Sequence, residues 1–256
     1  MIQSESASGH CCIAFWDSNS GKVALIAFTK RLFARILCLI QVFLILSSPS
    51  GCQERSAQPA NPKTVRESGD ELLIRIWNGV QEAQKRYSTG CGTLTEIRTS
   101  KLLFRPLKFH GKFCASGTDK FQLEYIEPEP IRLVFDRKYL NVTTGTKKRI
   151  TEVIDIGGAV SRAQRYFSAA DSIKNLRNNF AIEIEESSDS YTMKLVPRSR
   201  QFMQRVNYVV VVLRKRDFLL KKLEVDGKSG VNSVFSIDID ALNTDISEDV
   251  FMVIKP

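Results

Sequence analysis

Histidine is almost absent from this sequence. Only His10 and His110 occur among 256 residues, and the six cysteines follow neither a CxxC nor a zinc-ligand spacing. No Gly-x-Ser-x-Gly segment occurs either. His110 lies on an expected strand, and a Ser/His/Asp triad would depend on it once an N-terminal leader was removed. We therefore expect no metal site, no cofactor and no enzymatic activity such as lipid hydrolysis.

A hydrophobic run long enough to span a bilayer is also missing. The apolar run Ile36–Leu46 has eleven residues, whereas a transmembrane helix needs about 20. Basic residues precede this run and small residues ending at Cys52 follow it, which is typical of an export signal. The small residues resemble the lipobox of bacterial lipoproteins, although Pro49 stands where that motif usually has Leu.

This pattern predicts a leader over residues 1–51 and lipidation at Cys52. An acylated cysteine would give durable membrane attachment, because each buried methylene adds about 0.8 kcal/mol. A plain secretory signal and an uncleaved N-terminal anchor are the alternatives. Residues 52–67 are polar and contain two prolines, so they are expected to form a tether before a domain over residues 68–256.

Acidic residues are too few to balance the basic ones. The net charge is +9, of which +7 lies after residue 51. Such a surface favours anionic partners, for example lipid head groups or an acidic protein. The cations are spread through the strand-like segments without the aromatic-plus-basic motif of a nucleic-acid module, so nucleic acid is not an expected partner.

Alternating apolar and polar residues dominate the chain from residue 93 onward. In Lys120–Asp136 the alternation runs on both sides of an EPEP break, which predicts two half-buried strands separated by a turn. The same signals recur about eleven times. The expected strands are 93–100, 107–115, 120–126, 131–136, 139–143, 148–154, 180–185, 191–195, 206–214, 218–225 and 234–240.

Two segments have helical periodicity instead. Residues 69–87 carry apolar side chains at helical spacing after a capping box, Ser68 to Glu71, with Gly90-Cys91-Gly92 as the expected stop. Residues 157–179 favour one or two short helices. The expected fold is therefore mainly β (α+β): an incomplete antiparallel barrel capped by an N-terminal helix and a mid-chain helical insertion.

If the sheet curls around the first helix, its concave face is either a filled core or an apolar cavity, and the sequence leaves both open. The expected cavity-lining, ligand-binding residues are apolar ones from the helix and the strands: Leu73, Trp77, Phe121, Leu123, Tyr125, Leu133, Phe135, Ile182, Met193 and Leu195. Cys91 and Cys114 are either a disulfide in an oxidising compartment or two small buried residues, and we favour the second.

From about Asp70 to Val253 the chain resembles the LolA/LolB-type lipoprotein carriers of the bacterial envelope. The resemblance rests on the order of several features: the first helix, Asp119-Lys120, Tyr125, Glu127-Pro128 and Asp136-Arg137-Lys138. Gly117-Thr118 stands where the family often has the Arg-Pro pair whose arginine helps control the helical lid.

The resemblance implies a non-enzymatic carrier or acceptor that binds lipoprotein acyl chains, or lipid, in an apolar cavity. Implied partners are acylated lipoproteins, the membrane surface through lipidated Cys52 and an inner-membrane lipoprotein-releasing transporter, with the protein itself a monomer. Implied localisation is the periplasm, tethered to the outer membrane, because Gln53 is not the Asp that retains some lipoproteins in the inner membrane. A periplasmic protein-binding or sensor module on the same fold is the alternative.

Overall fold

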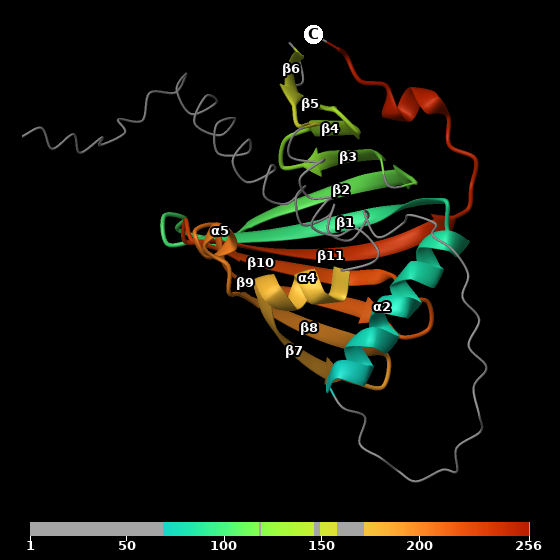
Figure 1. Ribbon diagram of the computed structural model, residues 1–256. Helices are drawn as coiled ribbons and strands as arrows, with labels where there is room; N and C mark the ends of the chain where they lie inside the picture. The colour runs from blue at the N-terminus through green and yellow to red at the C-terminus, as the bar shows by residue number, and fades with distance from the viewer. Residues whose placement is uncertain (1–68, 118, 146–148, 158–171, 256) are drawn as a thin grey trace, which may run out of the picture. The chain divides into compact units, whose positions relative to one another are not determined.

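A computed structural model describes residues 69–117, 119–145, 149–157 and 172–255 (Figure 1). The predicted leader, the tether with Cys52, the Ser68 cap and Thr118 lie outside these ranges. No helix within them is long and apolar enough to cross a membrane.

Eleven strands form a single antiparallel sheet in the order β6-β5-β4-β3-β2-β1-β11-β10-β9-β8-β7 (Figure 1). The predicted incomplete barrel is confirmed, because every neighbouring pair is antiparallel and the sheet does not close between β6 and β7. The strands are β1 Thr89–Ser100, β2 Leu107–Ser116, β3 Lys120–Glu127, β4 Ile131–Asp136, β5 Tyr139–Thr144, β6 Ile150–Asp155, β7 Phe180–Glu186, β8 Ser190–Pro197, β9 Val206–Arg214, β10 Leu220–Gly227 and β11 Val231–Leu242.

Local turns explain most of this order, and one long-range pairing completes it. Strands β1–β6 and β7–β11 are two meanders, and β1 joins them by pairing with β11 along its whole length, from Gly90↔Leu242 to Ser100↔Val231. The EPEP segment forms the turn between β3 and β4, as its prolines predict.

The strand register places the apolar residues of successive strands on one face. Phe121, Leu123 and Tyr125 lie opposite Phe135, Leu133 and Ile131. On the other meander, Leu195 pairs with Ile182 and Val209, which puts them on one face in the same way. The alternation read from the sequence therefore marks the faces of the sheet correctly.

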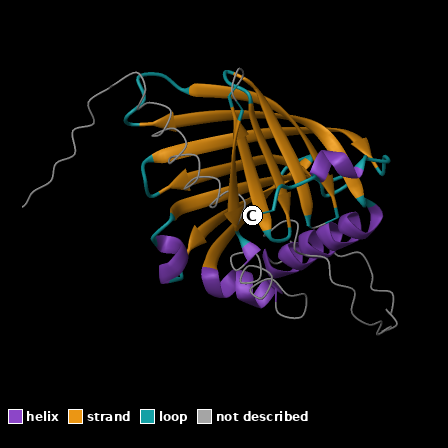
Figure 2. Cartoon of the chain, turned by 90° about the horizontal axis from the view of Figure 1, so that it is seen from above, coloured by secondary structure: helices purple, strands orange, loops and turns teal. Residues whose placement is uncertain are grey.

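Helix α2, Gly69–Arg86, covers this face, and Figure 2 shows the long helix lying against one side of the strands. Asp70 and Glu71 in its first turn and Lys85 and Arg86 in its last turn complement the helix dipole. Its buried side chains recur at helical spacing: Leu73, Ile76, Trp77, Val80 and Ala83.

The predicted helix stop at Gly90-Cys91-Gly92 is wrong, because these residues belong to β1. Gly92 is required by the sheet instead. A Cβ atom there would lie 2.0 Å from the carbonyl oxygen of Asp238, where a bulge brings β1 and β11 close together. The helix end is fixed by Asn243, whose side chain donates to the Arg86 carbonyl at 2.9 Å and accepts from the Ser88 N–H at 2.8 Å.

Two shorter helices and a 3-10 turn complete the described chain. Of the predicted helical segment 157–179, helix α4 spans Ser172–Asn179, and residues 158–171 lie outside the description. Helix α5, Arg200–Met203, precedes β9. The 3-10 turn η1, Glu248–Phe251, leads into a C-terminal segment on the outer face of β3–β5. There Arg132 donates to the Val250 carbonyl at 3.0 Å and Asn141 to the Ile254 carbonyl at 3.0 Å.

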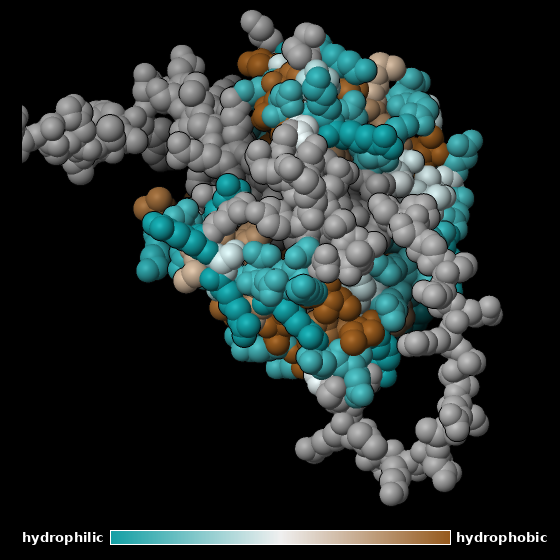
Figure 3. Space-filling model, viewed as in Figure 1, coloured by the Kyte–Doolittle hydropathy of each residue, from teal (hydrophilic) through white to brown (hydrophobic). Residues whose placement is uncertain are grey.

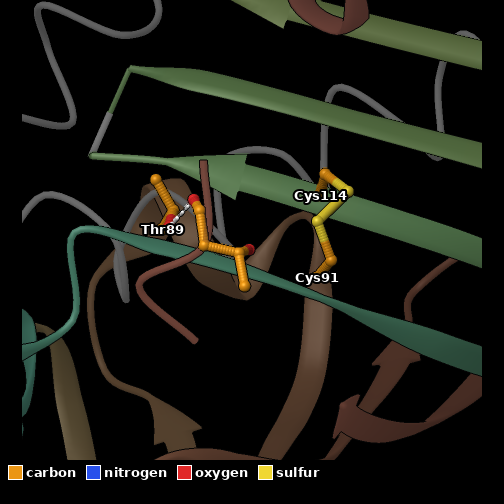
Figure 4. Close-up of a disulfide and its surroundings, with 4 residues drawn as sticks. Thr89, Cys91 and Cys114 are labelled. Atoms are coloured by element: carbon orange, nitrogen blue, oxygen red, sulfur yellow. Dashed lines mark hydrogen bonds between the residues drawn. A yellow bond between two sulfur atoms is a disulfide. The ribbon is translucent and has the colours of Figure 1, made fainter. Parts of the chain in front are cut away.

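Cys91 and Cys114 form a disulfide, which corrects our preference for two free buried cysteines. The two residues are direct cross-strand partners in β1 and β2, with Cα atoms 4.1 Å apart. Figure 4 shows the bridge beside Thr89, whose hydroxyl donates to the Thr244 carbonyl at 2.7 Å. The pairing was not predictable from spacing, because register depends on the whole hairpin.

Candidate functional site

A cavity of about 430 Å³ lies between α2 and the sheet. This volume is within the usual range of small-molecule sites, roughly 300–1,000 Å³. Its lining is overwhelmingly apolar, with Gln84, Ser88 and Thr89 among the few polar residues. The apolar lining side chains are Leu73, Ile76, Trp77, Val80, Ala83, Leu94, Phe113, Ala115, Phe121, Leu176, Met193, Leu195, Val209, Val211, Phe218, Leu219, Leu220, Leu223, Ile237, Ile239 and Leu242.

Cross-strand register builds the floor of this cavity. Val211 of β9 lies between Met193 of β8 and Leu223 of β10, so alternate residues of three neighbouring strands point the same way. Ile237 of β11 faces Leu94 of β1 and extends this floor toward the first meander. Aliphatic side chains from several strands thus form one continuous surface beneath α2.

Phe218 fixes the distance between α2 and the sheet at one end of the cavity. Its backbone φ is +57°, in the left-handed region that a bulky residue seldom adopts, and its ring stacks on Tyr191 with centroids 5.8 Å apart. A Cβ atom on Gly79 of α2 would lie 2.4 Å from this ring. Glycine at position 79 therefore lets the helix rest directly on Phe218.

A buried polar group lies on the same face, farther along β1 from Leu94. Glu96 is fully buried and accepts from the Arg98 Nε at 2.9 Å and from the Tyr125 hydroxyl at 2.7 Å. The Arg98 guanidinium also stacks 4.6 Å from the centroid of the Phe109 ring. Burial, and then the nearby negative charge of Glu96, raises the pKa of Tyr125 well above its ordinary value.

Within this network the charges and hydrogen bonds of Glu96, Arg98 and Tyr125 satisfy one another. His110 lies on the opposite face of the sheet, where its Nδ1 is 3.1 Å from the Thr95 hydroxyl oxygen. Within residues 69–117, 119–145, 149–157 and 172–255, no cluster of His, Cys, Asp and Glu could hold a metal ion. The arrangement can enclose an apolar ligand without covalent chemistry.

The structure divides the residues predicted for the cavity into two sets. Those that line it are Leu73, Trp77, Phe121, Met193 and Leu195. Those that do not are Leu123, Tyr125, Leu133, Phe135 and Ile182. Ligand binding by the first set stays a prediction.

The second set lies away from the cavity for a physical reason. Leu123, Leu133 and Phe135 are on the expected face, but each is only 2% exposed and close-packed. Tyr125 is held by Glu96, and Ile182 is half-buried on the edge strand β7. Alternation identifies the face of a strand but says nothing about the space above it.

The residues of β9–β11 that form most of the cavity floor were not assigned to the cavity from the sequence. The alternation in residues 206–214 and 234–240 had predicted strands, and their inward positions could have been assigned from it. Phe218 and Leu219 had been placed in the expected strand 218–225, but β10 begins at Leu220 and both residues lie in the connection between β9 and β10. Only the tertiary structure brings them to the cavity.

No family model and no curated protein matches the chain in sequence. Among solved structures, the chain is similar to a LolA superfamily protein of Nitrosomonas europaea, with 11% identity and a TM-score of 0.35 over 70% of this chain and 97% of that one. It is also similar to lipoprotein LppX of Mycobacterium tuberculosis, with 8% identity and a TM-score of 0.39 over 70% and 99%. A third is MucB with MucA from Pseudomonas aeruginosa, with 13% identity and a TM-score of 0.42 over 70% of this chain and 60% of that one.

These similarities are weak, with identities and TM-scores too low to bear on function. They include the LolA type that the sequence resembles. What the chain binds is therefore inferred from its own cavity.

Proposed function

We propose that this protein is a non-enzymatic carrier or acceptor of the cell envelope. It binds acyl chains of lipoproteins, or of lipids, in the cavity beneath α2 and passes them toward the outer membrane. The single observation that carries the proposal is the cavity itself, about 430 Å³ of space with an almost wholly apolar lining.

The chemistry of the lining fits an acyl chain. Each methylene removed from water gains about 0.8 kcal/mol, so a long chain is held without any polar contact. The walls offer aliphatic and aromatic side chains on all sides, with Trp77 above and Val211 and Leu223 below. Release requires only that the chain find another apolar environment, so a carrier of this kind needs no catalytic residue.

The expected location in the periplasm follows from the export signal in the sequence, and the disulfide in the fold is consistent with it. The export signal and lipidation at Cys52 would tether the domain to a membrane, on the periplasmic side. The Cys91–Cys114 disulfide is typical of an oxidising compartment such as the periplasm. Acylated lipoproteins, and a transporter that releases them from the inner membrane, are the partners such a carrier would need.

The experiment is to measure acyl binding after filling the cavity. Val211→Phe places a phenyl ring in the cavity floor, while Val212→Phe places the same ring on the outer face of the same strand. Extraction and mass spectrometry of lipid bound to the purified full chain, with titration of an acylated peptide, give the readout. We expect Val211→Phe to weaken binding by roughly tenfold or more, the usual effect of small volume changes in an apolar pocket, and Val212→Phe to leave it unchanged.

Two results would overturn the proposal. One is a chain that carries no acyl lipid and binds no acylated peptide. The other is equal binding by the two variants, since the acyl chain would then lie elsewhere on the protein.

A further inference from the structure

The loop between β1 and β2 exposes two large apolar side chains. Leu102 is 91% exposed and Phe104 is as exposed as a free residue, at 105%. The loop begins with a turn, in which the Leu103 N–H donates to the Ser100 carbonyl at 3.0 Å and the Leu102 N–H to the Ser100 hydroxyl at 3.3 Å. This turn leaves Leu103 half-buried and presents the side chains before and after it to solvent.

Cations surround these apolar side chains. Lys101 and Arg105 flank them in the loop, and Lys108 follows at the start of β2; all three are exposed. The β10–β11 turn with Lys228 adjoins the loop, since Ser100 pairs with Val231. We call this end of the sheet the basic tip.

Helix α5 brings further cations to the basic tip. The Lys228 N–H donates to the Arg205 carbonyl at 3.0 Å, which joins the β10–β11 turn to the end of α5. Arg200 is exposed within α5, and Met203 beside it is 50% exposed. Figure 3 shows hydrophobic atoms beside hydrophilic ones at the end of the molecule where Figure 1 places the β1–β2 loop and α5.

The basic tip carries more cations than the carboxylates near it can balance. Among the described residues, none of its cations (Lys101, Arg105, Lys108, Arg200, Arg205 and Lys228) forms an ion pair. Asp226 is nearby and is engaged by the Asn207 amide at 2.8 Å. Glu127 and Glu129 lie in the β3–β4 turn at this end of the sheet, and the β1–β2 loop projects beyond that turn (Figure 1).

We propose that the basic tip docks on the surface of an anionic phospholipid bilayer, with Leu102 and Phe104 inserted at the level of the head groups. Exposed apolar side chains framed by Lys and Arg are the combination that binds bilayer interfaces, because insertion and attraction to anionic lipid act together. A protein partner would need a shaped contact of about 1,000 Å², whereas these side chains project singly from a narrow loop. A bilayer accepts them without a complementary pocket.

Docking at the basic tip leaves the cavity accessible. Ser88, Gly90 and Gly117, which line the cavity, lie at the opposite ends of β1 and β2 from the tip. Leu94 and Ser100 are six residues apart on β1, which is about 20 Å of extended strand. The docking surface is therefore separate from the acyl site, and it stands whether or not the cavity binds lipid.

A local probe is needed to test the docking, because the apolar run Ile36–Leu46 gives the full chain its own affinity for bilayers. Phe104→Trp places an environment-sensitive fluorophore in the loop, read against the parent chain with its own Trp16 and Trp77. Met252→Trp is the matched control, at a residue 66% exposed in the C-terminal segment. Vesicles of phosphatidylglycerol and phosphatidylcholine, with brominated acyl chains as quencher, are compared with phosphatidylcholine alone.

We expect anionic vesicles to shift to the blue the emission that Phe104→Trp adds to the parent spectrum, and the brominated lipid to quench it. The emission added by Met252→Trp should show neither change. Combining Lys101→Glu and Arg105→Glu with Phe104→Trp should raise the lipid concentration needed by roughly tenfold or more, because two attractions to the anionic surface become repulsions. Lys112→Glu, on the exposed face of β2 away from the loop, should change it little. High salt should weaken the binding in parallel by screening.

Three results would overturn the proposal. The first is an unchanged emission of the Phe104→Trp chain when that chain co-sediments with the vesicles. The second is an equal shift with neutral and anionic vesicles, which would leave the cations without a role. The third is a shift with an acidic protein or a single-stranded oligonucleotide but not with vesicles, which would assign the basic tip to a macromolecular polyanion. The cavity variant Val211→Phe should behave as its parent in this assay, so failure here is separable from failure of the carrier function.

Discussion

Strands β8–β11 and strands β3–β5 both turn an alternating apolar face inward, yet the first group borders a cavity and the second, apart from Phe121, is filled. Val209, Val211 and Leu223 line the space beneath α2. The filled cluster (Leu123, Leu133, Phe135, Leu140 and Val142) is between 2% and 5% exposed and does not reach that space. The same binary pattern thus leads to opposite packing in two parts of one sheet.

The surroundings of the two parts account for the difference. α2 rests on Phe218 through Gly79, which sets the helix above β8–β11 at a fixed height. The filled cluster is on strands whose outer face is also covered, by the C-terminal segment that binds Arg132 and Asn141. Glu96 and its partners form a buried polar network on β1 and β3, next to the filled cluster. Protein interiors are close-packed unless a contact holds the facing elements apart. At the cavity, the contact of Gly79 with Phe218 keeps α2 away from the strands.

The largest effect is expected at the buried polar network of Glu96, Arg98 and Tyr125. Glu96→Ala leaves the Arg98 guanidinium buried without its partner and removes the acceptor of the Tyr125 hydroxyl. We expect the free energy of unfolding to fall by about 5 kcal/mol, measured by urea denaturation. Glu124→Ala, at an exposed carboxylate on β3, should change it by less than about 0.5 kcal/mol.

Replacing both Glu96 and Arg98 with leucine is a check on that explanation. The pair no longer leaves a charge unpartnered, so most of the lost stability should return. A double variant as unstable as Glu96→Ala would show that the loss comes from packing and not from the orphaned charge.

The next effect is a difference between matched truncations on the same sheet face. Leu133→Ala opens a new void in the filled cluster, so its unfolding free energy should fall by about 4 kcal/mol. Leu195→Ala should lose only about 2 kcal/mol, because Leu195 already borders empty space. Equal losses, measured by thermal and urea unfolding, would mean that the two regions are packed alike.

Enlarging a side chain should also destabilise the filled cluster more than the cavity region, with smaller effects than truncation. Val142→Phe overpacks the filled cluster and should destabilise the protein by about 2 kcal/mol. Val211→Phe has the cavity to occupy, and its effect should stay below about 1 kcal/mol. The comparison fails if Val211→Phe proves the more damaging substitution.

The smallest effect is expected at the β7–β8 turn, away from both regions. Hydrogen bonds from Lys221, Ser190 and Ser187 lower the pKa of Asp189 to about 2. The carboxylate is therefore favoured in the folded state, and its contribution is present above about pH 4 and lost as the pH falls toward 2. Asp189→Asn should remove a small part of the acid dependence of unfolding between pH 4 and pH 2. Wild-type acid dependence in that variant would contradict the assignment.

The strands and the first helix were predictable because their signals are local. Alternation placed the β strands, and helical spacing placed the apolar face of α2, which begins and ends within a residue of expectation. The cavity was predictable only in part. Leu73, Trp77 and Phe121 line it. Leu133 and Phe135 follow the same alternation as Phe121 and do not line it, because alternation does not determine the distance between the helix and each strand.

The sequence by itself determined the class of the fold: a sheet with one apolar face and a helix to cover it. Tertiary structure decided the pairing of β1 with β11, the disulfide between Cys91 and Cys114 and the position of the cavity. These features join residues far apart in the chain, and they depend on register and on the fit of Phe218 against Gly79. Local periodicity sets which way a side chain points, whereas only close packing between distant segments decides whether the space in front of it is filled.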